Sequence, residues 1–194
     1  VLIPALPDFL ARYPDIRLEL GVSDRSVDLI GDSVDCVIRG GMLNDSSLVA
    51  RHIGDAQMVT CAAPAYLERF GTPGHPDELK EGHRLACYVS TQNGRAMPLR
   101  FERGGEWIEV RGEHRIGINE SNAHLAAGLA GLGIVQTFRY CADQALADGT
   151  LVEVLAGWRQ PVFPFHVVYP QSRHLTQRLR VFIDWLAETF PQRV

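Results

Sequence analysis

The sequence predicts an α/β fold built from two lobes, and three observations carry this prediction. Residues 16–38 show a strand-like, then a helix-like, then again a strand-like apolar pattern with short connections, which is a strand–helix–strand unit. Residues 119–140 place a helix directly before a strand. Two proline-containing segments, near 63–74 and 158–164, interrupt the pattern and are interpreted as crossovers between lobes.

The two crossovers predict how the chain is divided. One lobe is formed by both chain ends, residues 1–64 and 163–194, and the other is an insertion of residues 65–162. Each lobe is expected to hold a mixed sheet flanked by helices. A cleft between such lobes is a common place for a small-molecule site.

The first third of the chain begins with an amphipathic helix over residues 2–13, which Pro14 ends because proline cannot continue a helix. Alternation of apolar and polar residues predicts a strand at 16–22. Ser23 or Asp24 is expected to cap a second helix. The elements that follow are a strand at 34–38, strands at 48–53 and 57–63, and a short helix at 64–70.

The rest of the chain repeats both kinds of element. Gly104 and Gly105 supply the turn of a predicted hairpin, because tight turns need positive φ. The predicted strands are 85–89, 99–103, 107–111, 115–118, 134–138, 151–155 and 165–169, and the predicted helices are 122–132, 141–147 and 175–190.

The stretch from Asn119 to Tyr140 is where we expect a ligand site. Ser121 and Asn122 are residues that cap helix N-termini, and small residues behind them let the helix approach a neighbouring element closely. Gly133 supplies the stop before the next strand. A helix N-terminus and a strand end then meet at one sheet edge, where open α/β folds bind small ligands.

Composition narrows the function. The net charge of −4 argues against nucleic-acid binding by this segment, and no apolar run reaches the roughly 18 residues that span a membrane. The four cysteines form no close pair and are interpreted as reduced core residues: Cys36, Cys61, Cys87 and Cys141. We therefore expect a cytoplasmic globular protein.

Catalytic and metal motifs are missing from the sequence. The seven histidines have no zinc-site spacing, and no G-x-S-x-G is present. Gly128, Gly131 and Gly133 end a helix, whereas a dinucleotide fingerprint must open one. We expect neither a metal nor a cofactor, and no enzymatic activity.

Five segments, in this order, resemble the effector-binding domain of LysR-type transcriptional regulators: IPALPDFLARYPDIRLEL, SDRSVDLIGDSVDCVIRGG, CAAPAYLERFGTP, HLAAGLAGLGI and VVYPQSRHLTQRLRVFIDWL. The resemblance covers essentially the whole chain. It implies a two-lobed fold like that of type II periplasmic binding proteins, a small-molecule inducer held between the lobes, and a homodimer or homotetramer.

The chain departs from that family at its start. Family members carry a winged helix-turn-helix, a linker helix and a first strand, and none of these precedes Val1. We expect the chain to be a fragment whose parent protein binds DNA through the missing N-terminal domain.

By this resemblance, Ser121 and Asn122 start the helix that points at the cleft, where they would contact an anionic or polar effector. Capping alone explains them equally well. Thr137 and Phe138, at the end of the next strand, would give the pocket one polar and one stacking surface. A core position explains Phe138 slightly better.

Val22 and Ser23 match positions where family pockets contact the effector, although Ser23 can be a cap alone. Arg39 can hold a carboxylate bidentately, which makes carboxylic acids candidate inducers. An ion pair that ties down the Gly40–Gly41 loop explains Arg39 slightly better.

The leading hypothesis is an effector-binding and dimerisation domain that controls transcription by binding a metabolite. The alternative is an extracytoplasmic solute-binding protein of a transporter, which shares the lobed fold. For the dimer, the resemblance implies that the opening helix packs on helix 122–132 of the partner copy.

Overall fold

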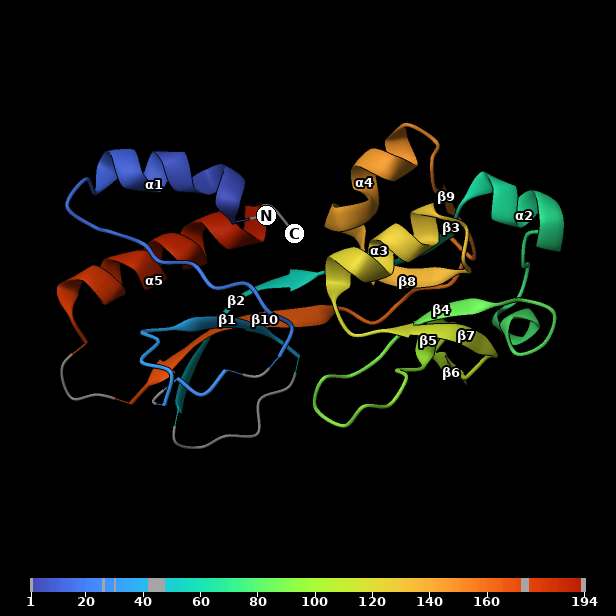
Figure 1. The fold of residues 1–194 in the computed structure, drawn as a ribbon, viewed down its shortest axis with the longest axis horizontal. Coiled ribbons are helices and arrows are strands. Elements are labelled where there is room, and N and C mark those ends of the chain that lie inside the picture. The colour runs from blue at the N-terminus through green and yellow to red at the C-terminus, as the bar shows by residue number, and fades with distance from the viewer. Residues whose placement is uncertain (1, 26, 30, 42–47, 172–174, 193–194) are drawn as a thin grey trace. The chain divides into compact units, whose positions relative to one another are not determined.

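A computed structural model describes residues 2–25, 27–29, 31–41, 48–171 and 175–192. The chain divides into two compact units (Figure 1). Unit 1 consists of Val1–Val22, Val27–Ala56 and Val162–Val194, and unit 2 consists of Ser23–Ser26 and Gln57–Pro161.

The first observed limit differs from the boundary predicted after residue 64, whereas the second, after Pro161, lies one residue before the boundary predicted after residue 162. The first limit follows Ala56, because strand β3 (Met58–Ala62) pairs with strands of unit 2. Pro64 begins helix α2 (Pro64–Phe70) inside that unit. The proline-containing segment there therefore connects two elements of one unit and not two lobes. The segment Ser23–Ser26 also belongs to unit 2, although both of its flanks belong to unit 1.

Unit 1 combines a three-stranded antiparallel sheet with helices. The sheet order is β1–β10–β2, with β1 at Val37–Gly40, β10 at Phe163–Pro170 and β2 at Leu48–Ala56. The helical elements are η1 (Ile3–Ala5), α1 (Leu6–Arg12), α5 (Gln177–Thr189) and η3 (Phe190–Gln192).

Aromatic side chains join α1 to α5 in the core of unit 1. The Phe9 ring is fully buried and lies 5.3 Å from the ring of Phe182 and 4.8 Å from that of Trp185, measured between centroids. Ile53 of β2 and Val167 of β10 belong to the same buried cluster. The apolar faces predicted for the first and last helices therefore meet each other and the sheet.

The predicted strand at 16–22 and the predicted helix after Ser23 are wrong for the described residues, which form neither element. Ile16 and Leu18 do pack against the core, so the side-chain alternation is real although no sheet pairing accompanies it. Around the helix position, the carboxylate of Asp28 accepts the Gly31 N–H at 3.1 Å, and that of Asp32 accepts the Asp28 N–H at 3.2 Å. Such local side-chain bonds compete with helix formation.

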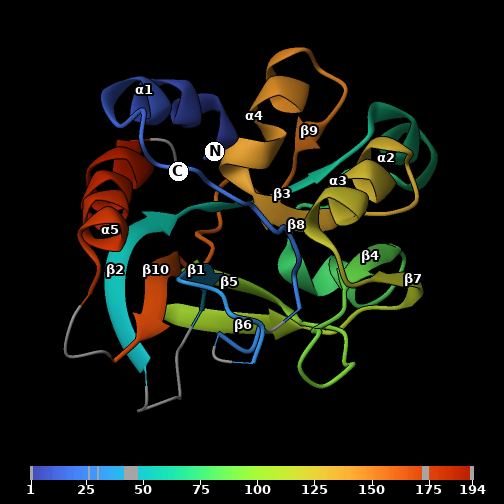
Figure 2. The same ribbon diagram turned by 60° about the vertical axis from the view of Figure 1, so that its left-hand side comes forward.

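Unit 2 contains three groups of paired strands, and a bridge between Leu85 and Ile134 links two of them (Figure 2). Strands β8 (Val135–Phe138), β3 and β9 (Val152–Glu153) form an antiparallel sheet in the order β8–β3–β9. Strands β4 (Leu85–Tyr88) and β7 (His114–Ile118) form a parallel pair. The predicted hairpin is confirmed as β5 (Leu99–Arg103) and β6 (Glu106–Val110).

The helices of unit 2 are α2, the short η2 (Pro76–Leu79), α3 (Ser121–Leu129) and α4 (Arg139–Ala147). The close approach predicted for the small-residue helix is confirmed, because a Cβ added to Gly128 would lie 2.7 Å from Cγ2 of Val135. None of the helices in the described part of the chain has the length and apolar character needed to span a bilayer.

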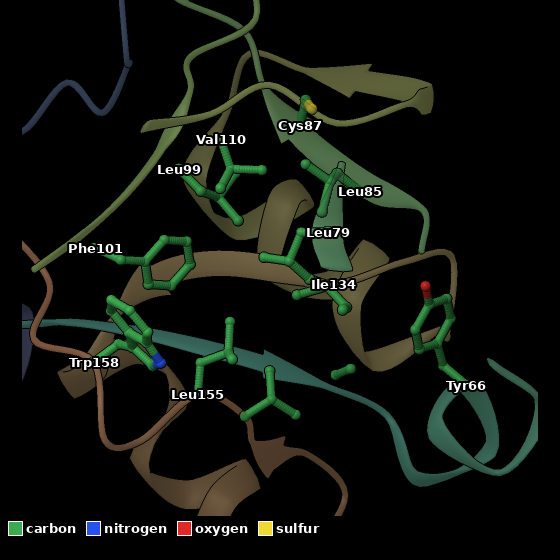
Figure 3. Packing of buried hydrophobic residues seen from close by; sticks show 12 residues of the cluster. Tyr66, Leu79, Leu85, Cys87, Leu99, Phe101, Val110, Ile134, Leu155 and Trp158 are labelled. Carbon is green, nitrogen blue, oxygen red and sulfur yellow. The ribbon is translucent and has the colours of Figure 1, made fainter. Parts of the chain in front are cut away.

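A hydrophobic cluster beside β4 anchors the hairpin and the loops of unit 2 (Figure 3). Phe101 of β5, Leu79 of η2 and Ile134 are all fully buried in it. A second buried cluster joins α3 and α4 to β3 and β8 through Val59, Val135 and smaller side chains. Strand β4 contributes side chains to both clusters, and Ile116 and Ile118 of β7 pack against the second.

Candidate functional site

The parallel strands β4 and β7 end side by side, and α3 begins directly after β7. The N–H of Val89 donates to the carbonyl of Ile118 at 2.7 Å, which carries the pairing to the ends of both strands. The carboxyl end of a parallel pair, next to a helix N-terminus, is where α/β folds bind ligands. Polar residues follow each strand at this edge: Ser90 to Gln92 after β4, and Asn119 to Ser121 after β7.

The N-terminus of α3 is capped by Glu120. Its carboxylate accepts the N–H of Asn122 at 3.0 Å and the N–H of Ala123 at 2.7 Å. These bonds hold the pKa of Glu120 below its usual value. The prediction that Ser121 and Asn122 are the caps is therefore wrong, because both lie inside the first turn.

A second carboxylate occupies the remaining donors at this helix end. Oδ2 of Asp24 accepts the backbone N–H and the hydroxyl of Ser121, both at 2.7 Å, and the hydroxyl of Tyr88 at 3.0 Å. The hydroxyl of Thr91 donates to the Asp24 carbonyl at 2.7 Å. We call these four residues the Asp24 clasp. It bonds the segment Ser23–Ser26 to the rest of unit 2.

The clasp tyrosine is held by its surroundings. Burial, helped by the negative charge of Asp24, raises the pKa of Tyr88 to about 12, so the hydroxyl remains a donor near neutral pH. Its ring packs edge-to-face against the ring of His124, with 5.8 Å between the two ring centroids. His124 is buried, its Nε2 lies 2.8 Å from the Ala86 carbonyl, and burial lowers its pKa.

Beside the clasp lies an open hollow of about 650 Å³, which we call the polar hollow. Five of its seven lining residues have polar side chains, and the lining consists of Arg25, Val89, Ser90, Thr91, Gln92, Gly94 and Asn119. The turn that carries four of these residues is closed by two bonds, Ser90 N–H to the Arg95 carbonyl and Gly94 N–H to the Ser90 carbonyl, both at 2.9 Å.

Three side chains of the polar hollow have uncommitted polar groups. Within the described residues, the Arg25 guanidinium and the side-chain amides of Gln92 and Asn119 make no hydrogen bond or ion pair. The hollow therefore offers one cation together with amides that both donate and accept. Within the same described ranges, no three His, Cys, Asp or Glu side chains lie close enough to hold a metal ion.

The predicted site residues are not all brought together. Ser121 belongs to the clasp, whereas the Asn122 amide donates to Glu120 at 2.8 Å. Val22 is 81% exposed and lies in unit 1. The hydroxyl of Ser23 accepts the Arg25 N–H at 3.1 Å and does not line the hollow.

Arg39, Thr137 and Phe138 lie in other places. Arg39 lies in β1 of unit 1, opposite His166, and is half-buried. Thr137 is buried in β8 opposite Val59. Phe138 is half-buried and stacks on Tyr140, with ring centroids 5.4 Å apart and planes within 7°.

The sequence analysis missed the polar residues after β4. It also missed the hydrogen bonds between Ser121 and Asp24. Polar residues directly behind two predicted strands, at 90–92 and at 119, were a usable signal for the sheet edge. No local sequence pattern predicts the hydrogen bond between Asp24 and Ser121, because the two residues are 97 positions apart in the chain. Asp24 had entered only as an alternative cap for a helix that does not form.

Comparison with known proteins gives a consistent result. The family model described as the LysR substrate binding domain matches residues 1–191. The HTH-type transcriptional regulator YhjC of Escherichia coli (strain K12) is 43% identical over 191 residues, covering 96% of this chain and 62% of that protein. An HTH-type transcriptional repressor of Pseudomonas aeruginosa (strain UCBPP-PA14) is 38% identical over 192 residues, covering 99% and 60%. The chain thus spans less than two thirds of these relatives.

Solved structures resemble the same kind of domain. The regulatory domain of CrgA from Neisseria meningitidis, a LysR-type regulator, matches with a TM-score of 0.82 and 32% identity, covering 97% of this chain and 91% of that one. Full-length AphB, a virulence activator of Vibrio cholerae, matches with a TM-score of 0.81 and 28% identity, covering 100% and 64%. Such regulatory domains have the two-lobed fold of periplasmic binding proteins. The chain therefore belongs to the LysR substrate binding domain family, the effector-binding domain of LysR-type transcriptional regulators.

Proposed function

We propose that this domain binds a small polar metabolite in the polar hollow, and that the longer protein uses this binding to control transcription. The observation that carries the proposal is the set of uncommitted groups at the carboxyl end of β4 and β7, namely Arg25, Gln92 and Asn119. Few convergent polar groups around a concave site are typical of ligand pockets.

The arrangement favours an effector with one carboxylate and at least one hydroxyl group. The first amides of α3 already donate to Asp24 and Glu120, so an effector carboxylate finds no donor there. Arg25 is the cation of the hollow, and a guanidinium binds a carboxylate with two parallel hydrogen bonds. The amides of Gln92 and Asn119 match hydroxyl groups, because they donate and accept.

The test is a binding screen on the 194-residue chain, using hydroxy acids and their neutral amides, by thermal shift and titration calorimetry. We expect some hydroxy acids to raise Tm and Arg25→Gln to weaken their binding about tenfold, the size of a lost charge-assisted bond. Arg17→Gln, an exposed arginine of unit 1, is the matched control. A screen in which no compound raises Tm, or in which both variants behave alike, contradicts the proposal.

DNA binding is proposed for the longer protein only. The relatives are HTH-type regulators of which this chain covers less than two thirds, and its own net charge is −4. A winged helix-turn-helix outside these residues would carry the phosphate contacts. We infer that such a protein acts in the cytoplasm, where it meets DNA, and that the domain itself catalyses no reaction. A turnover assay with any stabilising compound checks the last point.

We also propose that two copies associate through α1 and α3. Ile3 and Leu10 at the start of the chain are 64% and 41% exposed, and Leu129 and Leu132 near the end of α3 are 42% and 49% exposed. Apolar residues exposed on two helices are typical of an interface. Light scattering on the purified chain should report a dimer that Leu10→Glu dissociates, and a monomeric wild-type chain would contradict the proposal.

The transporter alternative loses support. The relatives and structures described above are transcriptional regulators, and the family model is named for LysR proteins. Both classes share the lobed fold, so the geometry of unit 2 by itself does not favour one over the other.

A further inference from the structure

A second hollow in unit 2, of about 300 Å³, lies away from the polar one, and we call it the apolar hollow. Three of its lining residues come from the hydrophobic core: Leu85 and Cys87 of β4 and Val110 of β6. Figure 3 shows their side chains close together at one side of the cluster. Their exposures of 1%, 4% and 0% mean that core packing already closes this side of the hollow to water, so the accessible apolar surface comes from other lining residues, above all Met97.

The other wall is a segment beside β4. The N–H of Met97 donates to the Tyr88 carbonyl at 2.8 Å, which holds Ala96 and Met97 along the edge of the strand. Met97 is 45% exposed although it is apolar, and Ala96 is half-buried. Methionine is the apolar side chain that adapts most readily to different shapes. The Met97 side chain can therefore change its conformation to accommodate a bound apolar group.

The rim of the apolar hollow is basic. Arg95, Arg111 and His114 contribute to its lining. Arg111 is already paired with Glu109, at 2.8 Å between Nη2 and Oε1. Within the described residues, the Arg95 side chain has no such partner, and the backbone bonds of Arg95 do not involve its guanidinium. An apolar floor thus meets one uncommitted cation at the opening.

We propose that the apolar hollow binds a small molecule with a short hydrocarbon or aromatic body and one carboxylate, as a site additional to the polar hollow. Binding covers the exposed part of Met97 and so removes apolar surface from water, and the carboxylate is met by Arg95. The volume is at the lower end of the range for ligand pockets, so the body must be small, such as six carbon atoms or one phenyl ring.

The two hollows share one segment of chain. Residues 89–92 and 94 line the polar hollow, and residues 95–97 line the apolar one.

The experiment uses methyl NMR on the 194-residue chain, with hexanoate and benzoate as probes and hexanamide and benzamide as neutral controls. The chain has three methionines, so the Met97 methyl signal is identified by its loss in Met97→Leu. We expect the Met97 signal to shift in a saturable way with the acids, and the amides to bind about tenfold more weakly because they lack the charge.

Two variants locate the binding. Arg95→Glu is an exposed change that preserves the fold, and Ala96→Leu fills the hollow; each should weaken acid binding about tenfold or more. Arg17→Glu, in unit 1, is the control of equal charge change and should bind like the wild type. An unshifted Met97 signal, equal binding of acids and amides, or unchanged binding by Arg95→Glu would each overturn the proposal. These outcomes leave the polar hollow untouched, because none of these residues lines it.

Discussion

Helices α3 and α5 begin in different ways, and the difference explains which parts of this protein a sequence reveals. At α5, the hydroxyl of Thr176 accepts the N–H of Leu179 at 3.3 Å, so the cap lies within three residues of its partner. At α3, the carboxylate of Glu120 bonds two amides locally, and Asp24 reaches the same helix end from 97 residues away. A local cap is chosen among a few neighbouring residues, so the sequence places it to within one or two positions, as it did at α3, whereas a partner 97 residues away has no local signal.

The largest expected effect comes from removing the distant carboxylate. Asp24→Ala leaves the Ser121 N–H and hydroxyl and the Tyr88 hydroxyl without their acceptor at a half-buried place. We expect the free energy of unfolding to fall by about 2–3 kcal/mol, as for a lost charged hydrogen-bond partner. Chemical denaturation measures this loss. Asp15→Ala, at an exposed aspartate, is the control, and an equal effect of both changes would show that the clasp adds nothing.

The next effect comes from the clasp tyrosine. Tyr88→Phe keeps the ring against His124 and removes only the hydroxyl that donates to Asp24. We expect a loss of about 1 kcal/mol in unfolding free energy. The double variant, Tyr88→Phe with Asp24→Ala, should lose less unfolding free energy than the two single variants lose together, because the two residues share one hydrogen bond. Full additivity would mean that the bond contributes no stability.

The local cap of α3 predicts a dependence on pH. The folded pKa of Glu120 lies below the usual 4.5, so its contribution to stability is present above the unfolded pKa and is lost as pH falls through the lowered folded value. Glu120→Gln should therefore be less stable than the wild type at neutral pH, by about 1 kcal/mol, and the gap should close in acid. Denaturation at several pH values measures this gap. A gap that stays constant into acid would contradict the assignment.

The smallest effect is expected at α5. Thr176→Ala removes one long and exposed cap bond, so the unfolding free energy should fall by about 0.5 kcal/mol. Thr176→Asp should restore it, because a carboxylate at the same position accepts the same N–H and favours the helix dipole. If Thr176→Ala costs more than Asp24→Ala, the contrast between the two helix starts is wrong.

The same contrast runs through the fold. Helix α2, the β5–β6 hairpin and helix α5 have signals inside their own residues: Pro64 at a helix start, Gly104–Gly105 between two strands, and a long apolar periodicity. All three were predicted near their observed bounds. The helix expected after Ser23 has equally good local signals and does not form in the described residues, where Asp24 bonds to a helix far along the chain and the carboxylates of Asp28 and Asp32 accept nearby N–H groups.

The candidate site follows this pattern too. The polar residues that follow β4 and β7 indicate the sheet edge at which we propose that a ligand binds, once both strands have been assigned. That Ser121 is bonded to Asp24 instead of facing a ligand, and that Thr137 is buried in β8, are results of tertiary packing. The family resemblance supplied the kind of site, but it did not show which donors remain free.

By itself, the sequence determined the α/β class, most of the helices and strands, and the family, because each depends on residues close together in the chain or on the order of segments. Only the tertiary structure decided where unit 2 begins, which carboxylate fills the start of α3, and which polar groups of Arg25, Gln92 and Asn119 remain uncommitted. The physical reason is that a hydrogen-bond donor is used up by whatever acceptor folding brings to it, and chain distance does not limit that choice.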